Sequence, residues 1–122
     1  MIQLNKYLRE IGIDEDYWLF RNVDGDKRYL QDEEGFVPIE FWDLDVTLAI
    51  YIYSHLCYFR DHYNNGYPSG MTEQQWNKCL DDMITAFKLL IQNDSNYKSK
   101  NRNKKIKYGL RLFAKHFTDL WY

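Results

Sequence analysis

The strongest local folding signal in this chain is the stretch MTEQQWNKCLDDMITAFKLL, residues 71–90. Thr72 is followed three residues later by Gln75, the spacing of a capping box, in which each side chain accepts a hydrogen bond from the other's backbone amide. Met71 and Trp76 stand at the two positions of a hydrophobic staple. Apolar side chains then recur at core spacing, at Trp76, Leu80, Met83, Phe87 and Leu90. This pattern predicts an amphipathic helix over residues 73–92.

A second helix is predicted over residues 44–63. Asp43 or Asp45 can cap its start, where a carboxylate meets unpaired amides and the positive end of the helix dipole. The cluster Asn64–Pro68 ends it. A helical wheel predicts one broad core face made of Asp45, Leu48, Ile52, Leu56, Phe59 and Tyr63. Cys57 projects away from that face and, like Cys79, is interpreted as a small apolar filler.

A third main helix is predicted over residues 104–121. The polar stretch 93–105 before it contains no aliphatic residue and is expected to be a mobile loop. The apolar residues of the helix fall within one arc, which predicts that they are core and that the terminal Trp121–Tyr122 closes the open end of a bundle. These residues are Ile106, Leu110, Phe113, Phe117, Leu120 and Trp121.

The N-terminal third follows a different pattern. Residues 2–11 predict a short helix stopped by Gly12. Aromatic-rich runs at 17–23 and 27–30 flank Asp-Gly, which indicates a hairpin, and residues 36–41 form either a third strand or an extended arm. The predicted fold is therefore mainly α, a three-helix bundle with a short N-terminal helix and a small β-hairpin. It forms one domain over 1–122, with an acidic region at 1–41 and the bundle at 42–122.

Composition limits the classes of function. The chain has 122 residues, of which 45% are hydrophobic and 18% aromatic, enough for one core without disulfides. Two cysteines and no secretory signal predict a reducing, cytoplasmic setting. The most apolar run, residues 46–59, is shorter than the roughly 20 residues that a membrane span needs.

Charge is distributed unevenly along the chain. Residues 10–45 hold twelve acids against three bases, a net charge of −9, and residues 46–122 hold eleven bases against six acids, a net charge of +5. A sequence pI near 5.9 argues against a dedicated binder of duplex nucleic acid. The asymmetry indicates one acidic and one basic region.

Catalytic and metal-binding patterns are not recognisable in the sequence. His55 and His62 are seven residues apart on one helix and cannot form a metal site without a carboxylate such as Asp45. Asp81 and Asp82 lie outside the core arc beside Lys78, which favours a solvated face over paired acid–base carboxylates. No phosphate-binding loop or nucleophile elbow occurs. We therefore predict a non-enzymatic protein without catalytic residues, resident metal or cofactor.

Two helical stripes are candidates for binding. The first is polar and aromatic, lies within a 60° arc, and suits stacking on a planar ligand as well as a helix–helix seam: Tyr51, His55, Tyr58 and His62. The second is basic, lies opposite the core arc of the last helix, and suits phosphate binding as well as an ordinary solvated surface: Lys104, Tyr108, Arg111 and Lys115.

A series of motifs in the C-terminal two thirds resembles a group of uncharacterised small bacteriophage proteins. The motifs are Trp42-x-Leu44-Asp45, Gly66-Tyr67-Pro68, Leu80-Asp81-x-Met83-Ile84-x-Ala86-Phe87 and Gly109-Leu110-x-Leu112-Phe113-Ala114-Lys115-x-Phe117-x-x-Leu120-Trp121. The likeness covers about residues 42–122. It implies an accessory phage protein in the host cytoplasm that acts by binding.

Two functions then compete. In the first, the two stripes of a homo-oligomer sequester a nucleotide-derived defence signal. In the second, the acidic N-terminal region blocks a basic host protein. A structural role in the virion is a weaker third hypothesis.

Overall fold

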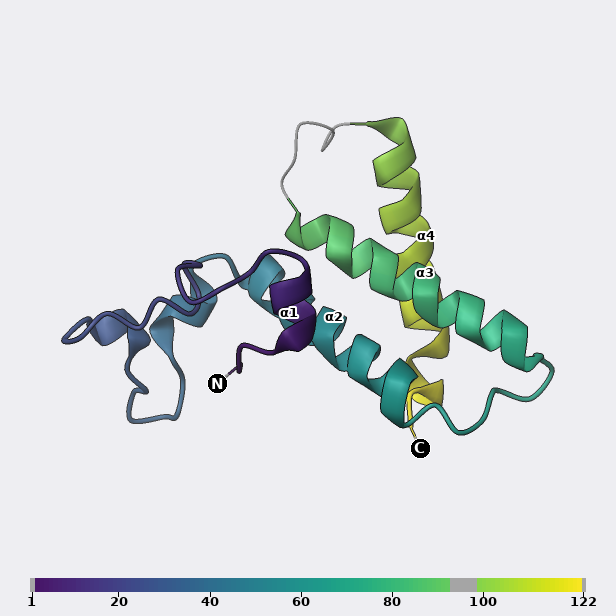
Figure 1. Ribbon diagram of the computed structural model, residues 1–122, viewed down its shortest axis with the longest axis horizontal. Helices are drawn as coiled ribbons and strands as arrows, with labels where there is room; N and C mark the ends of the chain where they lie inside the picture. Colours follow the sequence, from purple (N-terminus) through teal and green to yellow (C-terminus); the bar gives the residue numbers. More distant parts are fainter. Residues whose placement is uncertain (1, 93–98, 122) are drawn as a thin grey trace.

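The fold is mainly helical, as predicted. A computed structural model describes residues 2–92 and 99–121. Within these residues the α-helices are α1 (Lys6–Glu10), α2 (Leu44–His62), α3 (Glu73–Ile91) and α4 (Lys100–His116). Short 3-10 helices complete the secondary structure: η1 (Lys27–Tyr29), η2 (Pro38–Phe41) and η3 (Phe117–Asp119). Figure 1 shows α2, α3 and α4 grouped together, with much of the segment between α1 and α2 extending away from them.

The capping box at the start of α3 is confirmed. The Gln75 amide donates to Thr72 Oγ1 at 3.1 Å, and the Thr72 amide donates to Gln75 Oε1 at 2.9 Å. Trp76 is buried to 2% exposure, and Met71 is half-buried against the same core. The Trp76 indole Nε1 also donates to Asn64 Oδ1 at 3.0 Å. This last bond fastens the loop after α2 to the first turn of α3.

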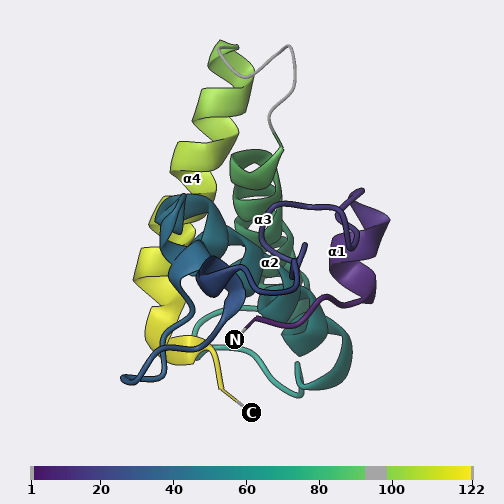
Figure 2. The same cartoon turned by 90° about the vertical axis from the view of Figure 1, so that its left-hand side faces the viewer.

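Helix α3 packs against both α2 and α4, whereas no Cα atom of α2 lies within 8 Å of a Cα atom of α4. The bundle is therefore open between α2 and α4. Figure 2 shows α4 and α1 on opposite sides of the pair α2 and α3. Among the described residues, no helix combines the length and apolar character that crossing a bilayer requires.

The predicted core face of α4 is only partly correct. Ile106 is buried and Phe113 is half-buried, but Phe117 and Trp121 are 61% and 74% exposed. Leu110 is exposed as well. The reason is that α4 approaches α3 through the small residue Gly109, which turns the contact stripe away from Leu110. The prediction that Trp121 closes a bundle end is therefore wrong; Tyr122 lies outside the described residues.

Helix α4 also begins earlier than predicted. Ser99 caps it, because its hydroxyl accepts the Arg102 amide at 3.1 Å. The Arg102 guanidinium donates to the Leu89 carbonyl of α3 at 2.7 Å. Residues 100–103, predicted as loop, are therefore helical, and residues 93–98 of that predicted loop lie outside the described residues.

The predicted core face of α2 is half correct, because Ile52 and Phe59 are half-buried against the core and Leu56 is buried. Leu48 is 52% exposed, and Asp45 and Tyr63 are exposed too. The residues that α2 buries lie instead on a face rotated from the predicted one: Thr47, Ala49, Ile50, Tyr53, Ser54, Leu56 and Cys57. The prediction that Cys57 points away from the core is thus also wrong.

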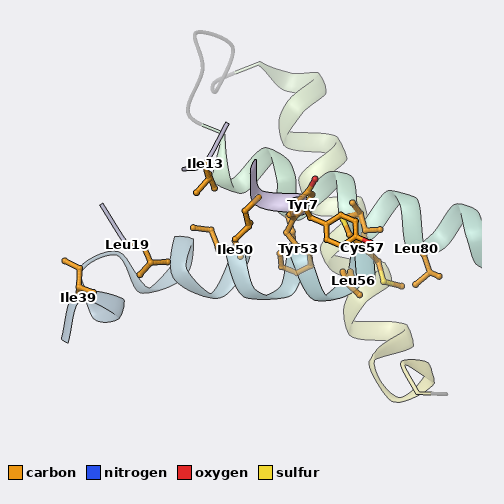
Figure 3. Close-up of a cluster of buried hydrophobic side chains, with 14 of the residues drawn as sticks. Tyr7, Ile13, Leu19, Ile39, Ile50, Tyr53, Leu56, Cys57 and Leu80 are labelled. Atoms are coloured by element: carbon orange, nitrogen blue, oxygen red, sulfur yellow. The ribbon is translucent and has the colours of Figure 1, made fainter. Parts of the chain in front are cut away.

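The N-terminal segment explains this rotation. Figure 3 shows Tyr7 close to Cys57 of α2, and Ile13 close to Ile50. Both N-terminal side chains belong to the same buried cluster as α2 and α3. Because the segment before α2 packs on the helix, it determines which side of α2 becomes core.

A 3-10 turn stands where the sequence predicted a β-hairpin, and the described residues contain no strand. Asp26 caps η1 by accepting the Arg28 amide at 3.0 Å. The Tyr29 hydroxyl donates to the Trp18 carbonyl at 2.6 Å and ties η1 back to the preceding segment. Residues 38–41, predicted as part of a strand or arm, form η2. The Asp26 cap and the buried ring of Tyr29 hold this segment together, in place of the backbone hydrogen bonds that would join the two strands of a hairpin.

Candidate functional site

An open groove of about 910 Å³ lies along the C-terminal half of α2. Residues of α2, of the N-terminal segment and of the C-terminal end of the chain line it. Its lining is almost entirely apolar or aromatic, and it exists because α2 and α4 diverge. Six of the lining side chains are Tyr51, His55, Tyr58, Phe113, Phe117 and Trp121.

Three members of the predicted polar-aromatic stripe line this groove. The rings of Tyr51 and His55 stack with centroids 3.8 Å apart and planes 18° apart. His55 Nδ1 lies 2.7 Å from the Tyr51 carbonyl oxygen, which fixes the imidazole on the ring. Tyr58 also lines the groove, whereas His62 does not; its ring lies 4.1 Å from that of Tyr58 between centroids and is tilted by 30°. Three of the four stripe residues therefore lie along the groove, and stacking between Tyr51 and His55 covers one face of each ring.

The opposite wall comes from aromatic residues that the sequence assigned to the core. Phe113 packs edge-on against Phe87 of α3 at 5.0 Å and against Phe117 at 5.5 Å. Phe117 and Trp121, both exposed, continue this row of aromatic side chains along the groove and out to the solvent. Sequence reasoning missed their role because an aromatic stripe on a helix has the same spacing whether it faces a core or a groove.

Tyr7 forms the third side of the groove. Its hydroxyl donates to Asp61 Oδ2 at 2.7 Å, and burial together with this carboxylate raises the pKa of Tyr7 to about 12. The Lys6 ammonium lies 4.9 Å from the centre of the Tyr7 ring. Among the described lining residues, Lys6 is the side chain that brings a permanent positive charge.

The basic stripe is separate from the groove. Its four members are exposed, and none of them lines the groove: Lys104, Tyr108, Arg111 and Lys115. Gly109 of the same helix faces α3, so these side chains point elsewhere. Within one chain the structure therefore does not bring the aromatic and basic stripes together.

A smaller pocket of about 380 Å³ lies between α1, α2 and α3. Its lining includes Arg60, which pairs with Asp61 at 2.9 Å and with Asp81 at 3.4 Å. Burial raises the pKa of the Cys57 thiol, which also lines the pocket, and thereby keeps it protonated and weakly nucleophilic at neutral pH. Arg60 is thus already shared between two carboxylates, and the thiol is placed as a packing group.

The two adjacent carboxylates of α3 are engaged separately. Asp82 accepts from Lys78 at 3.0 Å, the i,i+4 pair that the sequence favoured, and Asp81 pairs with Arg60 of α2. They therefore act as two surface ion pairs. Among residues 2–92 and 99–121, no three His, Cys, Asp or Glu side chains are grouped closely enough to hold a metal ion.

The groove is therefore the best-formed candidate site, and it offers stacking and burial of apolar surface. Comparison of the chain with protein-family models, curated proteins and solved structures finds no match, so a function must be inferred from the residues of the chain itself.

Proposed function

We propose that this protein acts by binding, without catalysis, and that its ligand occupies the groove along α2. The observation that supports this is the 910 Å³ apolar groove, whose rim presents the Tyr51–His55 stack. Ligand sites are typically concave, mostly apolar and of 300–1,000 Å³. Aromatic rings with polar edges at such a rim suit a planar ligand.

The ligand we propose is a nucleotide-derived signalling molecule, which an accessory phage protein would sequester in the host cytoplasm. Its base stacks on the open face of the Tyr51–His55 pair. Lys6 supplies one cation beside the groove. The further phosphate contacts come from Lys104, Arg111 or Lys115 of a second subunit, because these side chains do not line the groove of their own chain.

Calorimetric titration with cyclic and linear nucleotides tests this proposal. We expect heat with at least one nucleotide, and recovery of that nucleotide chemically unchanged. Tyr51→Ala should weaken binding about 5- to 150-fold, the effect of losing one stacking partner. Tyr67→Ala is the matched control, because Tyr67 is 57% exposed and does not line the groove.

The outcomes are distinct. Absence of heat with every nucleotide would overturn the nucleotide proposal. An equal loss of nucleotide affinity in the Tyr51→Ala and Tyr67→Ala variants would place the ligand outside the groove. A chemically altered nucleotide would make the protein an enzyme.

A second candidate function is supported by the acidic N-terminal region, which we propose as an inhibitory surface for a basic host protein. Its carboxylates are mostly solvent-exposed and lie on the segment that extends away from the helices in Figure 1. The exposed acids between α1 and η2 are Asp14, Glu15, Asp16, Asp24, Asp32, Glu33 and Glu34. Such a surface attracts a basic partner by long-range electrostatics that salt weakens.

The structure shows which acids can test this without disturbing the fold. Asp26 caps η1, and Asp32 accepts the amides of Glu34 and Phe36 at 3.0 and 2.9 Å, so both are structural. We expect Asp24→Asn combined with Glu33→Gln and Glu34→Gln to weaken binding to polylysine about tenfold at low salt. The free energy of unfolding, measured by thermal denaturation, should stay within about 0.5 kcal/mol of that of the parent protein. Unchanged binding in this triple variant would remove the acidic-surface proposal.

A further inference from the structure

Helix α4 concentrates positive charge. Residues 100–116 hold seven Lys or Arg and no Asp or Glu, a net charge of +7 in a chain whose net charge is −2. At 3.6 residues per turn, five of these bases and one tyrosine fall within an arc of roughly 100°. All six side chains are exposed, and we call them the basic face, which is the basic stripe together with two further lysines: Lys100, Lys104, Lys107, Tyr108, Arg111 and Lys115.

The basic face points away from the rest of the bundle. Gly109, on the opposite side of the helix, is the residue through which α4 approaches α3, and Ile106 is buried on that same side. Figure 2 places α4 at the outside of the bundle, across α2 and α3 from α1. The apolar side of α4 is therefore committed to α3, whereas an amphipathic helix that binds a membrane surface inserts its apolar side.

The cations of the basic face have no acidic partner among the described residues. None of the ion pairs within residues 2–92 and 99–121 includes a residue of this face. Asp82, whose carbonyl oxygen lies beside Gly109, is paired with Lys78, and Asp119, just after α4, is paired with His116. The charge of the basic face is thus free to attract an anionic partner.

This arrangement of charge opposes the stability of the helix itself. Lys100 lies in the first turn of α4, at the positive end of the helix dipole, where an acid would stabilise the helix. Lys107, Arg111 and Lys115 follow one another at i,i+4 spacing, and like charges at that spacing repel. An ordinary solvated face mixes both signs of charge. A stripe of one sign along a helix is instead typical of a surface that neutralises the phosphates of a nucleic acid.

Tyr108 indicates which form of nucleic acid fits. Its ring is 49% exposed among the cations of the face. Proteins that hold single-stranded nucleic acid combine cations, which neutralise the phosphates, with aromatic rings on which unpaired bases stack. A duplex keeps its bases stacked on one another, and an acidic peptide has no base, so neither would make use of this ring.

We propose that α4 binds a single strand of nucleic acid along the basic face. The strand follows the helix, with Tyr108 stacked on one base and Arg111 and Lys115 bound to neighbouring phosphates. From Lys100 to Lys115 the face extends about 22 Å, which accommodates a few nucleotides. The net charge of −2 and the acidic N-terminal region disfavour the larger contact that a duplex would need. This binding goes beyond the proposed nucleotide site, because it needs one chain only and does not use the groove.

Fluorescence anisotropy with a labelled oligothymidylate of about ten nucleotides tests this proposal. Arg111→Gln combined with Lys115→Gln should weaken binding about tenfold or more at low salt. The slope of log affinity against log salt should become shallower by about 1.4, because each phosphate contact to a single strand contributes about 0.7. The matched control, Lys27→Gln combined with Lys88→Gln, removes the same charge from exposed sites outside α4 and should change both quantities far less.

A second pair of variants tests the stacking contact. Tyr108→Ala should weaken binding about 5- to 150-fold, whereas Tyr108→Phe, which keeps the ring, should bind like the parent. Tyr67→Ala is the control, because Tyr67 is exposed and lies outside α4. Circular dichroism should show the helix content of the parent in every variant, since each substituted side chain is exposed.

Each contrary result overturns a stated part of the proposal. Absence of binding at low salt would remove it altogether, and equal weakening by the two charge variants would remove its assignment to α4. Full affinity in Tyr108→Ala, or equal binding of polyglutamate, would exclude a stacked base. Tighter binding of the same strand annealed to its complement would exclude the single strand. The nucleotide proposal is measured by calorimetry on Tyr51→Ala, so either proposal can fail without the other.

Discussion

Trp76→Ala is expected to lower the free energy of unfolding by about 3–5 kcal/mol, the usual range for removing a large aromatic from a core. Trp76 is 2% exposed and packs edge-on against His116 of α4 at 5.4 Å. Its indole Nε1 also donates a hydrogen bond to Asn64, which lies in the loop after α2. The substitution therefore leaves a cavity between α3, α4 and the loop after α2, and it removes the donor to Asn64 Oδ1.

Urea denaturation followed by circular dichroism measures this loss. Trp76→Phe is the conservative comparison, because it keeps an aromatic ring but removes the donor to Asn64. It should lose clearly less stability than the alanine variant. An alanine variant within about 1 kcal/mol of the parent would contradict the assignment of Trp76 as the centre of the core.

Gly109→Ala is expected to destabilise the protein by about 3 kcal/mol or more, at the upper end of the usual cost of overpacking. A Cβ atom at this position would meet the Cβ of Ala86 and the carbonyl oxygen of Asp82 closer than van der Waals contact permits. The Asp82 oxygen belongs to the backbone, and the Ala86 Cβ is the whole of a one-carbon side chain, so neither atom can rotate away. Helices α3 and α4 would have to separate.

Gly66→Ala is the matched control for this experiment. Nothing lies within 4 Å of a Cβ built at Gly66, and its backbone conformation needs no glycine. The substitution should be neutral or stabilise by up to about 1 kcal/mol, because it restricts the unfolded chain. If thermal unfolding gave the same midpoint for both variants, α3 and α4 would not approach each other through Gly109.

The candidate site was partly predictable from the sequence. The relative positions of Tyr51, His55 and Tyr58 follow from helical periodicity alone, and all three line the groove. Phe117 and Trp121 could not be assigned to it, since their spacing is equally typical of a core. Whether the basic stripe joined the groove depended on how α4 is rotated against α3, and Gly109 fixes that rotation through its close contact with Ala86.

What the sequence alone determined is local. The start of α3 was predictable because Thr72 and Gln75 find their hydrogen-bond partners within three residues. The existence of the three main helices was predictable for the same reason, since apolar periodicity and breakers act over short distances. The tertiary structure decided which side of α2 is buried. That helix carries apolar residues on more than one side, including the exposed Leu44 and Leu48, so periodicity did not single out the buried face. The N-terminal segment selected it by packing Leu8 and Ile13 into the core that contains Ile50. Only contacts between residues some forty positions apart could make that choice.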